Sequence, residues 1–147
     1  MNANDTIFAI ALASNLNPAQ HLHAACQEIA TWGQVHFSSH YVIPCRDGIG
    51  GDYWNSACLL TSSDSITVLM NKLEQLEQHA GRQRPSHQIS LDVDLIAWGA
   101  SLAQMQFNPK KMPLALDVKI PMFEIWPVDA FAHTQHHFPM IQSSAVL

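Results

Sequence analysis

The spacing of hydrophobic positions divides the first 100 residues into short segments, some typical of strands and others typical of helices. The run 6–14, TIFAIALAS, is apolar and short, as expected of a buried strand. Asn17 as a cap and Pro18 as the first helical residue then begin a run with apolar positions at helical spacing, which reaches about Trp32. Gly33 can end this helix. The first elements are therefore predicted to be a strand and a helix.

The next segments continue this pattern. Residues 34–43 and 53–62 are predicted to be strands, separated by an irregular loop over 44–52 that is rich in glycine and proline. Apolar residues at helical spacing within 63–81 predict a second helix, with a serine cap and Gly81 past its end. The run 87–99, HQISLDVDLIAWG, predicts another strand, and 121–133 predicts a short helix interrupted near Pro127.

The order strand, helix, strand, strand, helix, strand predicts an α+β fold. It is the ferredoxin-like βαββαβ sandwich, an antiparallel sheet with two helices packed on one face. A chain of 147 residues with 48% hydrophobic residues is expected to form a single domain over 1–147. No apolar run is long enough to span a membrane, and no basic segment leads into an apolar signal region, so we expect a cytoplasmic protein.

Charge narrows the function classes. The net charge of −5 and only seven Lys and Arg residues argue against a nucleic-acid surface, which requires a clustered basic face. The one adjacent basic pair, Lys110 and Lys111, stands in the sequence NPKKMP and is expected in a solvated loop. Neither nucleic acid nor membrane is therefore an expected partner.

Cysteine and histidine, which often bind metals, give weak signals here. The three cysteines have neither CxxC spacing nor a disulfide pattern and are expected to be packing residues: Cys26, Cys45 and Cys58. The sequence HTQHH near the C-terminus is expected in a solvated tail, with a transition-metal site as the alternative; its histidines are His133, His136 and His137.

Two acids interrupt the most apolar predicted strand. In an extended strand, Asp92 and Asp94 project from one face while the residues between them fill the other. Two adjacent carboxylates repel each other, and a divalent cation is the simplest partner that stabilises such a pair. A magnesium site is therefore the leading hypothesis, and a solvated strand edge is the alternative.

Several motifs around these acids occur in a specific order. ASNLNP, DYWN, Glu77, GRQR and LDVD together resemble the 6-hydroxymethyl-7,8-dihydropterin pyrophosphokinase (HPPK) family over about the first 100 residues. The resemblance implies Mg2+-dependent transfer of diphosphate from ATP to a pterin alcohol, a step of folate biosynthesis. It also implies two Mg2+ ions, with ATP and a pterin as the small-molecule partners. We expect a monomer.

The resemblance also implies a role for each matched residue. Asp92 and Asp94 match the metal-binding pair, and Tyr53 and Asn55 match the pterin pocket. Arg82 and Arg84 match residues beside the nucleotide phosphates. Glu77 matches a supporting acidic residue, and Phe123 matches an aromatic residue that stacks on the pterin.

This sequence departs from the family at charged positions. Ile89 stands where the family has an arginine just before the aspartates, and the preceding loop is shortened to PSHQIS. The segment directly before Phe123 lacks the family's histidine, and Lys119 is a candidate replacement for the family's basic residue there. Ala13 replaces a glycine of the family. Three functions stay open: an active pyrophosphokinase, an impaired paralogue that binds a pterin or nucleotide, and a regulatory module that dimerises through its sheet edge.

Overall fold

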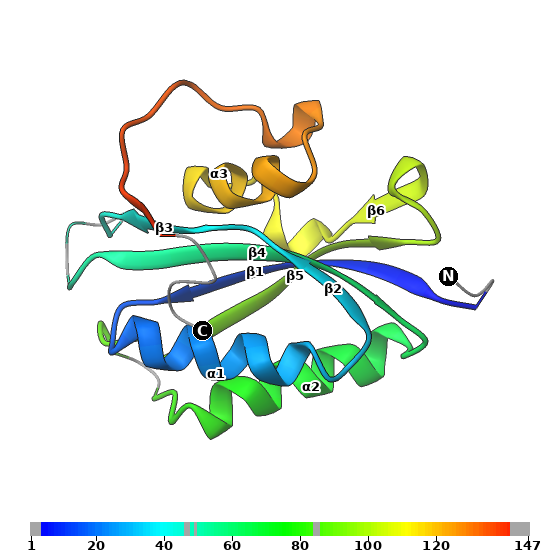
Figure 1. Cartoon of the computed structure of the whole chain (residues 1–147), viewed down its shortest axis with the longest axis horizontal. Coiled ribbons are helices and arrows are strands. Elements are labelled where there is room, and N and C mark those ends of the chain that lie inside the picture. The colour runs from blue at the N-terminus through cyan, green and yellow to red at the C-terminus, as the bar shows by residue number, and fades with distance from the viewer. Residues whose placement is uncertain (1–3, 46–47, 49, 84–85, 142–147) are drawn as a thin grey trace.

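The computed structural model describes residues 4–45, 48, 50–83 and 86–141, and a single sheet runs through its middle (Figure 1). Two helices, α1 (Pro18–Ile29) and α2 (Ile66–His79), lie on one face, and α3 (Leu116–Ile125) lies on the other (Figure 1). The strands are β1 (Thr6–Ser14), β2 (Gln34–Phe37), β3 (His40–Ile43), β4 (Tyr53–Ser62), β5 (Asp92–Gly99), β6 (Met105–Phe107) and β7 (Met140–Ile141).

The sheet follows the order β6-β5-β1-β4-β3-β7, and β2 also pairs with β4. Every recorded pairing is antiparallel. The prediction of a ferredoxin-like α+β fold is therefore confirmed, with β6 and β7 as short additions at the edges. These two strands have three and two residues, too few to show a periodic pattern in sequence.

The helix boundaries confirm one predicted cap and correct another. The Ser65 side chain accepts a hydrogen bond from the Val68 amide, and Gly81 takes a φ of 79° after α2, as expected. Asn17 begins α1 with a φ of 45° but makes no side-chain cap bond. Helix α1 ends at Ile29, so Gly33 is not its terminator; a Cβ at Gly33 would overlap the Thr61 carbonyl oxygen.

Three predicted segments have different boundaries in the structure. The strand expected over 34–43 divides into β2 and β3 at Ser38. The Ser38 amide donates to the Ala57 carbonyl, but the Ala57 amide donates to the Ser38 hydroxyl instead of to a backbone carbonyl, which interrupts the regular pairing. Strand β5 begins at Asp92 rather than at residue 87. Helix α3 begins at Leu116, contains Pro121 and ends before Pro127.

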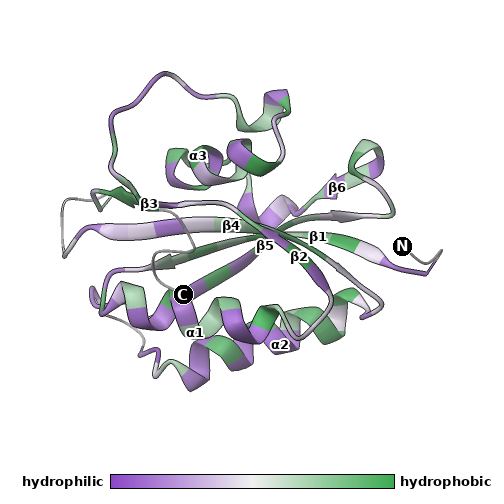
Figure 2. Cartoon of the chain, viewed as in Figure 1, coloured by the Kyte–Doolittle hydropathy of each residue, from purple (hydrophilic) through white to green (hydrophobic). Residues whose placement is uncertain are grey.

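The two faces of β1 contribute to two different cores. Its larger side chains, Phe8, Ile10 and Leu12, pack with residues of α1 and α2, and its alanines Ala9 and Ala11 pack in the cluster that includes Met122 of α3. Hydrophobic and hydrophilic residues are interspersed along α1 and α2, as expected of helices with one buried face (Figure 2).

The prediction of a solvated tail is correct only in part: His137 is exposed, whereas His133 and His136 are half-buried and the described chain up to residue 141 is attached to the fold. After α3 the chain passes over this helix and returns to β3, where β7 pairs with it (Figure 1). Phe131 is fully buried, and the His136 ring lies near those of Tyr41 and Phe138, with centroids 5.8 and 5.4 Å away. The aromatic residues among the histidines supply the apolar surface that holds this segment against the fold.

Candidate functional site

A pocket of about 260 Å³ opens where β1 ends and where β4 and β5 begin. These three strand ends lie together at the left of the sheet in Figure 1. The lining residues come from β1, the loop before β4, β4, β5 and α3: Ala11, Leu12, Ala13, Cys45, Tyr53, Asn55, Asp92, Asp94, Asp117 and Val118.

Small side chains on β1 leave room for the pocket. Ala13 lies between Asn55 of β4 and Asp92 of β5, and Ala11 lies opposite Asp94. Residues directly opposite each other in antiparallel strands project from the same face, so the amide and both carboxylates face the same side of the sheet. This is the face that α3 covers, and a larger residue at position 13 would occupy the space between the amide and Asp92.

The paired aspartates share one face, as the sequence predicted. Burial raises the pKa of Asp94, and the nearby Asp92 carboxylate raises it further, while Lys111 and Arg82 oppose the shift. The charged form of Asp94 therefore costs free energy that an additional cation would offset. The Asp92 and Asp94 side chains keep 36% and 29% of their surface exposed, so both remain accessible from the pocket.

Arg82 is hydrogen-bonded to the chain segment that carries these acids. Its Nη1 donates to the Leu91 carbonyl at 2.9 Å and to Asp92 Oδ1 at 3.2 Å, and it lies 3.8 Å from Glu77 Oε2. Glu77 Oε2 in turn accepts from the Val93 amide at 2.9 Å. Because the Arg82 and Glu77 side chains are only 10% and 13% exposed, this network fixes the start of β5 from the end of α2.

Two of the three residues predicted to bind the pterin, Tyr53 and Asn55, line this pocket. Asn55 is 4% exposed, and its Nδ2 donates to the Tyr53 carbonyl over a long 3.4 Å. Within the described part of the chain, this is the one side-chain hydrogen bond recorded for Asn55. A buried amide with so weak an internal bond is suited to a ligand edge that carries both donors and acceptors.

The SNL motif has a role that the sequence did not assign. The Asn15 side chain donates to the His87 carbonyl at 2.8 Å and accepts from the Ile89 amide at 2.6 Å, and its backbone amide donates to the Ile89 carbonyl. The shortened loop is therefore tied to the end of β1. Gly50, with a φ of 91°, lies beside this junction, where a Cβ would be 3.0 Å from the His87 carbonyl oxygen.

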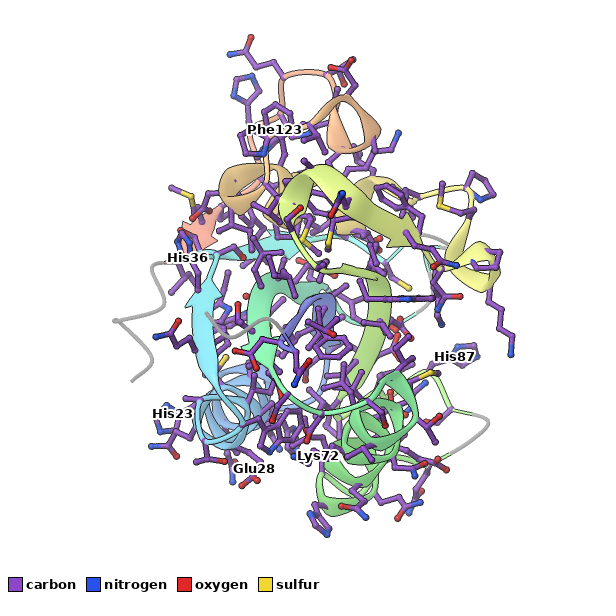
Figure 3. The ribbon with its side chains drawn as sticks, turned by 90° about the vertical axis from the view of Figure 1, so that its right-hand side faces the viewer. His23, Glu28, His36, Lys72, His87 and Phe123 are labelled. Carbon is purple, nitrogen blue, oxygen red and sulfur yellow. The ribbon has the colours of Figure 1, made fainter. Side chains whose placement is uncertain are left out.

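Two predicted site residues are not placed in the pocket by the described structure. Phe123 lies on α3 (Figure 3), but its ring packs in the second core cluster and meets His133 edge-on at 5.5 Å. The α3 residues in the lining are Asp117 and Val118. Asp117 is six residues before Phe123, roughly 120° away around the helix axis. Arg84 lies outside the described residues, so its assignment to the phosphates stays a prediction.

The sequence analysis missed three lining or neighbouring residues. Cys45 lines the pocket, whereas Cys26 and Cys58 are buried packing residues as expected. Asp117 lines it from α3. Lys111 is not a purely solvated residue, because its Nζ lies 2.8 Å from Asp94 Oδ1. None of these three residues has a local sequence signal, whereas the alternation of small and large residues in β1 does indicate that one face of this strand leaves space.

The carboxylate pair suits magnesium bound together with a nucleotide. Mg2+ is usually held by one or two carboxylates, water and substrate phosphates rather than by a complete protein cage. The described residues contain no cluster of three or more His, Cys, Asp or Glu side chains able to hold a metal. The alternative of a transition-metal site at His133, His136 and His137 is therefore not supported within the described part of the chain.

The chain is thus a ferredoxin-like α+β protein with an acidic, amide-containing pocket at its strand ends, where small molecules commonly bind in such folds. A sequence model of the 7,8-dihydro-6-hydroxymethylpterin-pyrophosphokinase (HPPK) family matches residues 9–132 of the 147. The chain therefore belongs to this family, whose enzymes use ATP and Mg2+ in folate biosynthesis. A search of curated proteins found no match to the chain. Among the described residues, no helix is both long and apolar enough to cross a membrane.

Proposed function

We propose that this protein transfers diphosphate from ATP to the hydroxymethyl group of a dihydropterin. The observation that carries the proposal is the common pocket: Asp92, Asp94, Asn55 and Tyr53 come from two strands and line one cavity beside Ala13. In this reaction the pterin alcohol oxygen bonds to the β-phosphorus, and the bond from that phosphorus to the α–β bridging oxygen breaks. AMP leaves and the alcohol proton passes to solvent.

The position of each side chain supports the role proposed for it. Asp92 and Asp94 hold Mg2+, which supplies charge neutralisation on the phosphates when bound. Arg82 and Glu77 act as positioning residues, because they hold the backbone on both sides of Asp92. Asn55 hydrogen-bonds the pterin edge, and Tyr53 forms the pocket wall beside it. The Phe123 and Arg84 assignments stand only on the resemblance.

The test is AMP release from ATP, Mg2+ and 6-hydroxymethyl-7,8-dihydropterin. We expect pterin-dependent AMP formation by the wild-type chain and its loss in the Asp92→Asn, Asp94→Asn double variant, which keeps side-chain volume but removes both charges. Lys72→Met is the matched control, because Lys72 pairs with Asp64 away from the pocket. Equal background release by all three proteins would contradict the proposal.

The second candidate function is a binding protein without turnover. It is favoured by Ile89, whose backbone is bound to Asn15 and whose aliphatic side chain supplies no charge next to the aspartates. Transition-state stabilisation lost with one charged contact is about 2.7 to 4 kcal/mol by comparison with an oxyanion donor. Pterin binding measured by calorimetry, without AMP release, would support this candidate.

A further inference from the structure

A lysine next to the pocket already neutralises one of the two aspartates. Lys111 belongs to the short turn Pro109–Lys111, and its Nζ lies 2.8 Å from Asp94 Oδ1. The two side chains are 38% and 29% exposed, so the ion pair stands at the border between pocket and solvent. The neighbouring Lys110 makes no ion pair with any described residue.

Asn108 holds this turn against β5. It is 7% exposed, its amide donates to the Ile96 carbonyl at 2.8 Å, and its Nδ2 donates to the Leu95 carbonyl at 2.9 Å. Its Oδ1 accepts from the Lys110 amide, and its carbonyl accepts from the Lys111 amide. The backbone that carries Lys111 is therefore fixed to the residues that follow Asp94 in the same strand.

The two aspartates differ in how firmly each holds its cation. Arg82 contacts Asp92 while also bonding the Leu91 carbonyl, and its side chain is 10% exposed, so it cannot leave without exposing buried acceptors. Lys111 has one recorded partner, Asp94, on a long flexible side chain that is more exposed. Arg82 is thus a fixed cation, and Lys111 is an exchangeable one.

We propose that Lys111 occupies the cation position on Asp94 until Mg2+ and nucleotide bind, and that its ammonium group then contacts the nucleotide phosphates. The inference rests on the proposed function, since it needs metal and nucleotide at these aspartates. A lysine ammonium is a compact donor suited to phosphate oxygens, and the released Nζ starts within one ion-pair distance of Asp94. Lys111 then supplies positive charge in a site where Ile89 supplies none.

The test compares two matched variants, Lys111→Met and Lys110→Met, which remove the same charge from adjacent positions. Affinity for Mn2+ alone is followed by the electron paramagnetic resonance signal of the free ion. Affinity for the α,β-methylene analogue of ATP with Mg2+ is measured by calorimetry. Lys111→Arg serves as a third variant, because a guanidinium retains the ion pair with Asp94 and the phosphate contact.

We expect Lys111→Met to bind Mn2+ alone about fivefold more tightly, since the competing cation on a partly exposed carboxylate is gone. The same variant should bind the ATP analogue about tenfold more weakly, through the lost charged contact to phosphate. Lys110→Met should leave both affinities at the wild-type values, and Lys111→Arg should restore both.

Two results overturn the inference and are distinguishable from each other. If the wild type binds Mn2+ and the analogue, but Lys111→Met changes neither affinity or only one of them relative to Lys110→Met, the exchange does not occur and the proposed function still stands. If the wild type binds neither Mn2+ nor the analogue, the exchange and the proposed function fail together.

Discussion

Replacing Arg82 tests whether this residue has a structural role or binds phosphate near the aspartates. We predict that Arg82→Met destabilises the protein, because it leaves the Glu77 carboxylate and the Leu91 carbonyl without their guanidinium partner. The Arg82 and Glu77 side chains are 10% and 13% exposed. Breaking a buried pair by removing one partner typically costs about 3 to 5 kcal/mol.

The expected loss is at the lower end of this range. Asp92 is 36% exposed, so solvent screens its part of the interaction and we assign it almost nothing. The remaining contacts predict a loss of about 3 kcal/mol in the free energy of unfolding, or about 10 °C in Tm for a chain of this length. A phosphate-binding arginine free in the pocket would instead cost less than about 1 kcal/mol when replaced.

The assay is urea denaturation followed by circular dichroism, with Lys72→Met as the control. Lys72 pairs with Asp64 at 2.6 Å, with side chains 33% and 22% exposed, so its replacement should cost less than about 1 kcal/mol. In the Arg82→Met background, Glu77→Gln should cost less than it does alone, because the interaction between the two side chains is already lost. Equal losses for Arg82→Met and Lys72→Met would refute the reasoning.

Variants at three further positions test other parts of the account. Ala13→Val should fill the space between Asn55 and Asp92 and weaken pterin affinity by about tenfold or more, whereas Ala13→Ser should not; calorimetry measures both. Burial lowers the pKa of His40 from its usual 6.5, so the unfolded chain takes up its proton first and stability falls as the pH drops below about 6.5. His40→Phe should flatten this slope between pH 7.5 and 5.5 in urea denaturation, and an unchanged slope would contradict the assignment. Glu124→Gln should cost about 0.5 to 1 kcal/mol, because Glu124 is exposed and the glutamine keeps one acceptor for the Tyr41 hydroxyl at 2.7 Å and the Ser39 amide; no loss of stability would contradict a stabilising role for these bonds between α3 and β3.

Local patterns were sufficient for the elements that build the sheet. Strands β1 and β4 have the predicted boundaries, α2 has the predicted serine cap, which is Ser65, and Gly81 follows its end as predicted. The common face of Asp92 and Asp94 also follows from strand geometry alone. These features depend on neighbours within a few residues, which a single sequence contains.

The features that escaped prediction depend on contacts across the fold. The approach of Lys111 to Asp94 depends on Asn108 binding the backbone of β5, which no periodicity encodes. Likewise, the face that α3 turns to the sheet decides whether Asp117 or Phe123 reaches the pocket, and this helix contains Pro121 and lacks a clear polar face. Tertiary packing, rather than local preference, sets both outcomes.

The most direct test of the central claim is a single-turnover reaction with the protein in excess over 6-hydroxymethyl-7,8-dihydropterin, in the presence of Mg2+ and ATP. Mass spectrometry follows the pterin product, which detects even a slow enzyme. The account predicts a diphosphorylated pterin formed in equal amount with AMP by the wild type, and none by the Asp92→Asn, Asp94→Asn variant. Unmodified pterin in both reactions would contradict it.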